Sequence, residues 1–283
     1  MMKAAFIGAL VGLLGLGCSD SGGGGGVGTI SVLATDAPLD HSQVSEATIR
    51  VDEIRIHADA NAQGGFLTLY DGEPIEMNLL ELNNGITQEL VKADLPAGAY
   101  RQLRLHVESA TLRLVNDNVY DTEAGTLHLT SQDTSGFKVF IDPPIVVFKA
   151  LTTELLLDVD LSKTFLPTPS DDPLTATSYS LLPVIRVANL STSGEIRGVV
   201  TTDDGLGGFV PMEAASVYIM PPGELDTLNS VASTATDVDG AYAVLGLAAG
   251  TYDVLATKDA LEDRVDGAIV SVGNVTVVDL TLQ

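Results

Sequence analysis

The sequence predicts an all-β protein built from two tandem β-sandwich domains. Apolar side chains recur at every second position in short runs, and clusters of Gly, Pro, Asp and Asn separate these runs. After residue 194 the runs become shorter and more strongly punctuated by glycine. A chain of 283 residues is long enough for two domains. We therefore expect a first domain over residues 28–190, a linker at 191–194 and a second domain over residues 194–283.

Residues 1–17 have the pattern of a signal peptide. One positive charge, Lys3, precedes an apolar run over residues 4–16, which is shorter than the about 20 residues that span a bilayer. Gly17 and then Cys18, the only cysteine of the chain, follow this run. The segment resembles a bacterial lipoprotein signal, which implies cleavage before Cys18 and lipid attached to its thiol. The alternative is an ordinary secretory signal beside an incidental cysteine.

Residues 18–27 would then form a tether between the lipid and the first domain. They include five consecutive glycines, and about 10 such residues reach roughly 15–20 Å. Ser19 stands where an Asp is associated with inner-membrane retention in enteric bacteria. By this resemblance we expect an exported, lipid-anchored protein at the outer membrane or cell surface.

The first domain is expected to consist of short strands joined by turns. Strands are predicted over residues 29–38, 47–58, 100–115, 126–132, 137–144, 145–150, 152–165 and 179–190. The alternation slips at Asp52 and Glu53, which predicts a β-bulge. Residues 77–95 lack alternation and indicate a short helical turn near 79–82 or 87–92. Residues 166–178, rich in Pro, Ser and Asp, are expected to form a long loop.

In two of these strands the alternation separates an inward face from an outward face. The inward positions are Leu103, Leu105, Val107, Leu155, Leu157, Val159 and Leu161. The polar residues Arg104, His106 and Glu108 alternate with the first three of them and lie on the opposite face.

The second domain contains two spaced motifs, "TDVDGAY" and "LAAGTYDV". Their characteristic residues are Thr236, Asp237, Gly240, Tyr242, Leu247, Gly250, Tyr252 and Val254. With these motifs the domain resembles the carboxypeptidase regulatory-like family. The resemblance implies a prealbumin-like sandwich of about seven strands, also called a carbohydrate-binding-like fold, and it transfers no binding site.

The acidic turn of the first motif is expected to be structural. Asp237 and Asp239 can bond to the backbone of their own turn, and Gly240 permits a positive φ. The alternative is a calcium loop, but Ala248 occupies the twelfth position, where an EF-hand needs glutamate.

The first domain resembles a family of prokaryotic surface lipoproteins known as domain of unknown function 4382. The segments that carry the resemblance are "GTISVLATDAPLD", "LPAGAYRQLRLHVE", "LLLDVDLSKTF" and "YSLLPVIRV". It implies location at the cell surface and supplies no reaction. The turn "LPAGAY" also resembles "LAAGTY" of the second domain, as expected of two sandwiches that use the same turn chemistry.

The chain is strongly acidic, which limits its partners. It has 14 Lys and Arg against 38 Asp and Glu, and its formal net charge is -24. Such a charge repels phosphate backbones, so we expect no nucleic-acid partner. Either cations are the small partners, or the charge serves solubility.

No local catalytic motif is present. The sequence lacks Gly-x-Ser-x-Gly, His-Glu-x-x-His and Walker A patterns, and its four histidines are scattered. His106 and Glu108 fall one residue short of a His-x-x-Glu zinc motif, and a solvent-facing pair is the alternative. We therefore expect no enzymatic activity.

Four carboxylates form the best candidate site. Asp158 and Asp160 lie two residues apart on one strand and share a face with Glu154, and Asp36 in the "TDAP" turn could join them. Converging carboxylates are typical ligands of Ca²⁺, the one cofactor that the sequence suggests. The alternative is a solvated strand face on an acidic protein.

The sequence favours a non-enzymatic surface lipoprotein that binds, adheres or forms a scaffold at the bacterial envelope. Its partners would be the membrane, through the lipid, and a surface glycan or protein. One alternative is a carbohydrate-binding accessory protein, although the chain has no Trp for sugar stacking. The other is an enzyme whose site is assembled in space within the first domain.

Overall fold

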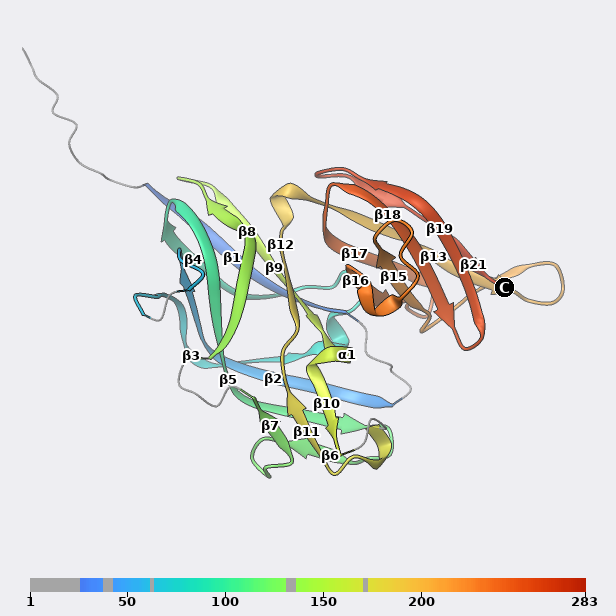
Figure 1. Ribbon diagram of the computed structural model, residues 1–283, viewed down its shortest axis with the longest axis horizontal. Coiled ribbons are helices and arrows are strands. Elements are labelled where there is room, and N and C mark those ends of the chain that lie inside the picture. Colours follow the sequence, from blue (N-terminus) through green and yellow to red (C-terminus); the bar gives the residue numbers. More distant parts are fainter. Residues whose placement is uncertain (1–25, 38–42, 62–63, 131–135, 170–172) are drawn as a thin grey trace, which may run out of the picture.

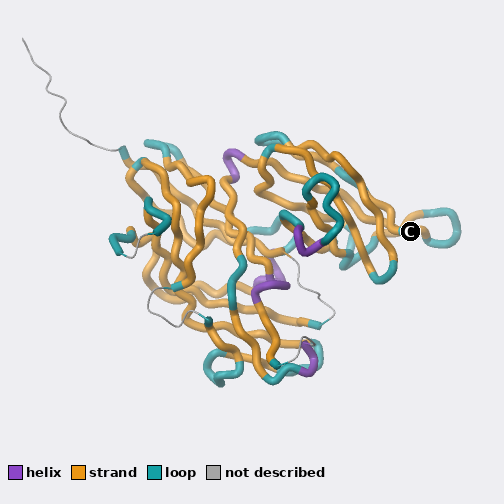
Figure 2. The backbone as a smooth tube through the Cα atoms, in the orientation of Figure 1, coloured by secondary structure: helices purple, strands orange, loops and turns teal. Residues whose placement is uncertain are grey.

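The structure, a computed structural model, describes residues 26–37, 43–61, 64–130, 136–169 and 173–283. Most of them lie in β-strands, which confirms the prediction of an all-β protein (Figure 2). The strands form two bodies side by side (Figure 1). We call β1–β12 the first domain and β13–β21 the second domain.

The first domain contains two large sheets and a small one. One large sheet has the strand order β12 (Ile185–Asn189), β9 (Thr152–Asp160), β1 (Val27–Ala37), β4 (Gln88–Pro96). The other has β3 (Leu67–Asn78), β2 (Val44–His57), β5 (Gly98–Leu114), β6 (Val119–Asp121), with β8 (Phe137–Val147) also paired to β5. The small sheet is β10 (Phe165–Thr168), β11 (Ser178–Leu181), β7 (Leu127–Leu129). Short helical segments are η1 (Leu79–Leu82), α1 (Leu161–Thr164) and η2 (Pro173–Thr175).

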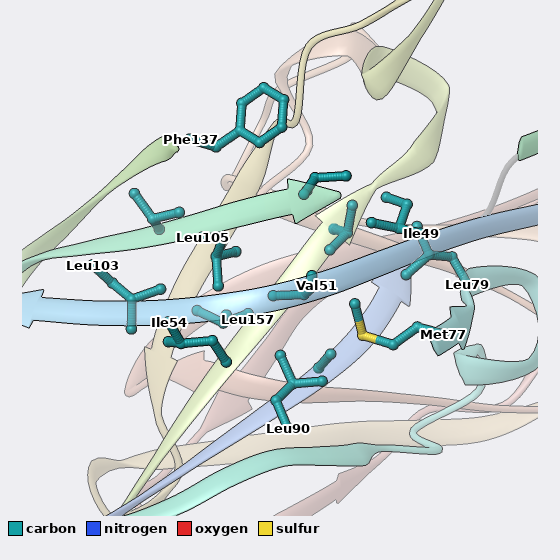
Figure 3. Close-up of a cluster of buried hydrophobic side chains, with 14 of the residues drawn as sticks. Ile49, Val51, Ile54, Met77, Leu79, Leu90, Leu103, Leu105, Phe137 and Leu157 are labelled. Carbon is teal, nitrogen blue, oxygen red and sulfur yellow. The ribbon is translucent and has the colours of Figure 1, made fainter. Parts of the chain in front are cut away.

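The core of the first domain lies between its two large sheets. Figure 3 shows Ile54 of β2, Leu103 of β5 and Leu157 of β9 in one cluster of buried side chains. The predicted inward residues of β5 and β9 all belong to this core, so that prediction is confirmed. The alternation of strand side chains therefore correctly identified the face that turns toward the core.

The second domain has its own core between two sheets. One sheet contains β14 (Phe209–Pro211), β13 (Ser193–Asp203), β17 (Ala241–Ala248), with β20 (Val275–Val277) and β21 (Leu280–Leu282) along successive parts of β13. The other has the order β16 (Ala232–Ala235), β15 (Ser216–Met220), β18 (Gly250–Lys258), β19 (Leu261–Val270). Two short 3-10 helices complete the elements, η3 (Leu190–Thr192) and η4 (Thr227–Asn229). Its core shares no residue with that of the first domain.

The two similar turn sequences build the same tyrosine contact. The Tyr100 hydroxyl donates to the carbonyl of Pro96 at 2.8 Å, and the Tyr252 hydroxyl donates to that of Ala248 at 2.9 Å. Burial raises the pKa of both phenols. Each ring is thus tied to the backbone four residues earlier, a device of β-sandwich corners that explains the shared hexapeptide.

Several local predictions are confirmed. β2 shifts register between Val51 and Glu53, where the bulge was expected. Residues 79–82 form the 3-10 helix η1. Asp237 Oδ1 accepts from the backbone N–H groups of Asp239 and Ala241, and Gly240 has a φ of 71°. These features depend on neighbours in the sequence, which is why they were predictable.

Other expectations were wrong. The second position suggested for the helical turn, 87–92, is not helical, because residues 88–92 belong to β4. The two strands expected over 137–150 are one strand, β8, which accommodates Pro143 and Pro144 where its register against β5 shifts. The strand expected over 152–165 ends at Asp160 in α1, and the one over 179–190 is divided at Pro183. Part of the expected loop 166–178 is β10 and η2, and residues 191–194 belong to η3 and β13.

Candidate functional site

The outer face of β9 is covered by the second domain. Leu156 is fully buried although it belongs to neither core. It lies opposite Gly246 of β17: a Cβ added there would be 3.1 Å from Leu156 Cδ2 and 2.7 Å from Ala188 Cβ. Gly246 has a φ of 70°, a conformation that glycine adopts without strain. A glycine at this position therefore allows the two domains to pack closely.

Arg186 of β12 crosses this junction. Its Nε and Nη2 donate to Asp158 Oδ2 at 2.9 and 2.6 Å. Its Nη1 donates to the carbonyl of Gly246 at 2.7 Å, and Nη2 also donates to that of Leu245 at 2.8 Å. One guanidinium thus neutralises a buried carboxylate of the first domain and binds two backbone carbonyls of the second.

A second contact joins the domains at the turn after η1. The backbone N–H of Asn84 donates to Thr234 Oγ1 at 3.2 Å, and Asn84 Nδ2 donates to Asp237 Oδ2 at 2.9 Å. Asp237 therefore caps its own turn with one oxygen and binds the first domain with the other. Sequence reasoning missed this role, and the only signal was the Asn84-Gly85 dipeptide, which marks a turn.

A small polar cleft lies beside Arg186. It measures about 130 Å³, and its lining comprises Asp158, Asp160, Lys163, Val184, Arg186 and residues 230–233. Asp158 is only 5% exposed, and its Oδ1 has no hydrogen-bond partner. Asp158 thus lines the cleft and retains one buried oxygen without a hydrogen bond, which is unusual for a buried polar atom.

The structure gives the predicted carboxylates separate partners. Asp158 pairs with Arg186, and Asp160 pairs with Lys163 Nζ at 2.9 Å and also accepts from its backbone N–H. Glu154 is exposed at the other end of β9. Asp36 lies in β1 opposite Val159, and its side chain lies outside the described residues.

Within the described ranges, no three His, Cys, Asp or Glu side chains gather into a metal site. The alternative, a solvated strand face, is wrong for Asp158, because the second domain covers that part of β9 and Asp158 is buried. Calcium binding stays a prediction, and it is checked by whether EGTA lowers the melting temperature.

The three polar side chains of β5 have different surroundings on the face opposite the core. Arg104 is 5% exposed, and its guanidinium lies 4.2 Å from the centre of the Phe66 ring. Burial, and then the charge of Arg55, lowers the Arg104 pKa. His106 faces Asp52 at 2.5 Å from Nδ1 to Oδ1 and does not form a zinc pair with Glu108, which is exposed and lies near Arg50.

The predicted attachment point, Cys18, lies outside the described residues. In the described part of the chain, no helix is long and apolar enough to cross a membrane.

The comparison with protein families assigns the first domain. Residues 27–176 match the family described as a domain of unknown function, DUF4382. The chain belongs to the DUF4382 family. The match includes β9, with Asp158 and Asp160, and α1, with Lys163, and it ends before Arg186. The junction therefore joins a DUF4382 carboxylate to an arginine beyond the matched segment.

No curated protein matches this DUF4382 chain. Among solved structures it is similar to BcpA, the major pilin subunit of Bacillus cereus, at 9% identity and a TM-score of 0.25, over 91% of this chain and 70% of that one. It is also similar to GBS52, the minor pilin of Streptococcus agalactiae, at 11% identity and a TM-score of 0.24, over 89% of this chain and 94% of that one. Scores of this size do not establish a common fold.

Proposed function

We propose that this DUF4382 protein is a non-enzymatic module of the bacterial surface, anchored by lipid at Cys18, that binds, adheres or serves as a scaffold. We further propose that it comprises a first domain over 28–190 and a carboxypeptidase regulatory-like domain over 194–283. The observation that carries the scaffold role is the junction at Arg186. A domain that must be presented in one orientation needs contacts that prevent free rotation, since loosely joined domains move relative to each other.

Three features of the junction support a fixed orientation. Arg186 links Asp158 to two carbonyls of β17, Asn84 bonds to Thr234 and Asp237, and Leu156 is buried between the domains. The connection through η3 is also short, because β12 ends at Asn189 and β13 begins at Ser193. These contacts lie on different elements, so they restrain rotation about more than one axis.

Two measurements test this proposal. Metabolic palmitate labelling and intact mass should show lipid on the wild-type chain and none on Cys18→Ser; equal labelling of both would overturn the anchor. Small-angle scattering of the chain from residue 18 onward should fit one body, whereas Arg186→Ala should broaden its distance distribution. Ser233→Ala, which lines the cleft, is the matched control. A wild-type profile that already requires many domain orientations would overturn the scaffold role.

Capture of a glycan is a second candidate, and the cleft is the observation that favours it. Sugar hydroxyls donate to carboxylates, and Asp158 Oδ1 has no partner while Ser230, Ser233 and Lys163 line the same space. A glycan array probed with the wild-type chain and with Ser233→Ala tests it. Specific signals weakened by the substitution would support it, and an array without signals would remove it.

A further inference from the structure

The turns around the start of β1 form one continuous face that spans both domains. Ala97 N–H donates to the carbonyl of Gly26 at 2.6 Å, and Ala150 N–H donates to that of Val27 at 2.9 Å. The turns after β4 and β8 therefore flank the point where the described chain begins. In Figure 1 this point is at the upper left, and the turns of both domains lie along the upper edge.

The same face continues across the junction. An apolar groove of about 280 Å³ is lined by Phe148 from the first domain, Thr192 and Ser193 from the connection, and Ala248 from the second domain. Gly273 N–H then donates to the carbonyl of Ser193 at 2.8 Å. We define the tether face as Val27 together with residues 96–101, 146–152, 190–194, 248–251 and 271–275.

The tether face carries no acidic residue. About one residue in seven of the chain is Asp or Glu, 38 of 283, yet none falls in these segments, which contain Arg101 and Lys149. Three acids flank these segments: Asp94 accepts from Thr29 Oγ1 at 2.9 Å, Glu195 lies 3.7 Å from Arg197, and Glu154 is exposed two residues beyond Thr152. This neutral to slightly basic surface stands out on a protein of net charge -24.

The opposite end of the molecule is acidic. β13 begins on the tether face at Ser193 and ends at Asp203, about 33 Å away at about 3.3 Å per residue. Asp204 follows, the turn after β18 carries Asp259, and Glu262 lies near the start of β19. The acidic groups at this end therefore lie about a full strand length from the tether face.

Apolar side chains project from the tether face. Val27 is 54% exposed, Phe148 57%, Leu151 60% and Val272 51%. Large apolar side chains that gather on one surface without acidic residues mark a contact site for a protein or a membrane. The tether decides between these partners, because only seven residues lie between Cys18 and Gly26, a reach of about 15 Å.

From this geometry we infer that the tether face rests on the bilayer that holds the Cys18 lipid. This inference depends on the proposed lipid anchor. The tether face is then a second membrane contact, and together with the anchor it fixes the orientation of the protein on the bilayer. Phe148, Leu151 and Val27 enter the headgroup region, as the apolar side of an interfacial segment does. The absence of carboxylates avoids repulsion from the negative surface potential of anionic lipids. The acidic loops then point away from the membrane.

The chain offers a direct test because it contains no Trp and a single Cys. The chain from residue 18 onward is coupled through Cys18 to a maleimide lipid in phosphatidylcholine vesicles. Phe148→Trp places the only Trp on the tether face, and Phe209→Trp, at a site 67% exposed beside Asp203, is the matched control. We expect the emission of Phe148→Trp to shift to shorter wavelength and to be quenched by brominated phosphatidylcholine, with neither effect in Phe209→Trp.

Vesicle co-sedimentation and circular dichroism check that each variant is attached and folded. Leu151→Trp gives a second reading if Phe148→Trp fails to fold. Emission that stays unquenched in the attached, folded tether-face variants would overturn the inference, as would equal quenching of Phe209→Trp. Because the anchor is attached in vitro, this result is independent of whether cells lipidate Cys18, which palmitate labelling decides.

Discussion

Two buried arginine–aspartate pairs, one at the domain junction and one inside the second domain, use the same chemistry for different purposes. Asp158 and Asp253 are 5% and 4% exposed, and each accepts an arginine Nη2 at 2.6 Å. Asp253 also accepts from the backbone N–H groups of Gly223 and Gly267, so both of its oxygens are bonded. Asp158 has only Arg186, and its buried Oδ1 has no hydrogen-bond partner.

This difference shows how a buried charge can serve either the fold or the junction. Asp253 ties the loop after β15 and the bend of β19 into one domain, with Arg264 also bonded to the carbonyl of Glu224. Asp158 instead depends on one guanidinium that also carries the contact with β17. The structure therefore predicts unequal consequences when the two arginines are removed.

The largest effect is expected from Arg186→Ala. It leaves the Asp158 carboxylate buried without a partner, which typically costs about 3–5 kcal/mol. Arg264→Ala should cost about 2 kcal/mol, because the two backbone N–H groups still bind Asp253. Urea titrations of both variants measure the losses. An equal or larger loss for Arg264→Ala would contradict the distinction between the two pairs.

A smaller effect is expected when a glycine is replaced by alanine in each region, Gly246 at the domain junction and Gly267 inside the second domain. Gly246 and Gly267 both have positive φ, 70° and 78°. A Cβ at Gly246 would clash with Ala188 and Leu156, whereas a Cβ at Gly267 meets nothing within 4 Å. Gly267→Ala should therefore cost only the backbone strain, about 1–2 kcal/mol.

Gly246→Ala should cost about 1–3 kcal/mol more than Gly267→Ala, because the domains must also separate. The difference between the two urea midpoints measures this extra loss. Equal midpoints would show that the junction is looser than Leu156 and Gly246 indicate.

The smallest effect, confined to acid, is expected at Asp253. Burial alone would raise its pKa, but the bonds from Gly223, Gly267 and Arg264 outweigh burial and hold the pKa below its usual value. The ionised Asp253 carboxylate therefore stabilises the folded protein fully above its unfolded pKa of about 3.9. This contribution is lost as the pH falls through the lower pKa of the folded protein. In the wild type, the melting temperature should therefore decrease when the pH is lowered below about 4.

Asp253→Asn removes this titrating carboxyl and should weaken the dependence of the melting temperature on pH. Measurements between about pH 2 and pH 6 on both proteins test it, since that window spans the titration of carboxyl groups. If the melting temperatures of the wild type and of Asp253→Asn change equally with pH, the bonds around Asp253 do not stabilise its charged form.

The sequence predicted which side chains share a strand face, but it did not predict which distant segments pack against that face. The alternation along β9 correctly placed Leu155 and Leu157 in the core, and it also placed Asp158 and Asp160 on one face. It could not indicate that β17 covers that face, so Asp158 was predicted to be a metal ligand or a solvated carboxylate. Nor could the alternation along β5 indicate that Phe66, from a distant segment, lies over Arg104.

The sequence by itself determined the all-β class, the inward faces of β5 and β9, the bulge at Asp52 and the turn at Asp237, since each depends on residues within a few positions of one another. Only the tertiary structure decided that Arg186 meets a carbonyl 60 residues away and that five segments without an acidic residue converge beside the tether. Strand periodicity tells which side chains share a face. What lies against that face depends on how distant segments pack, because burial is a property of the whole fold.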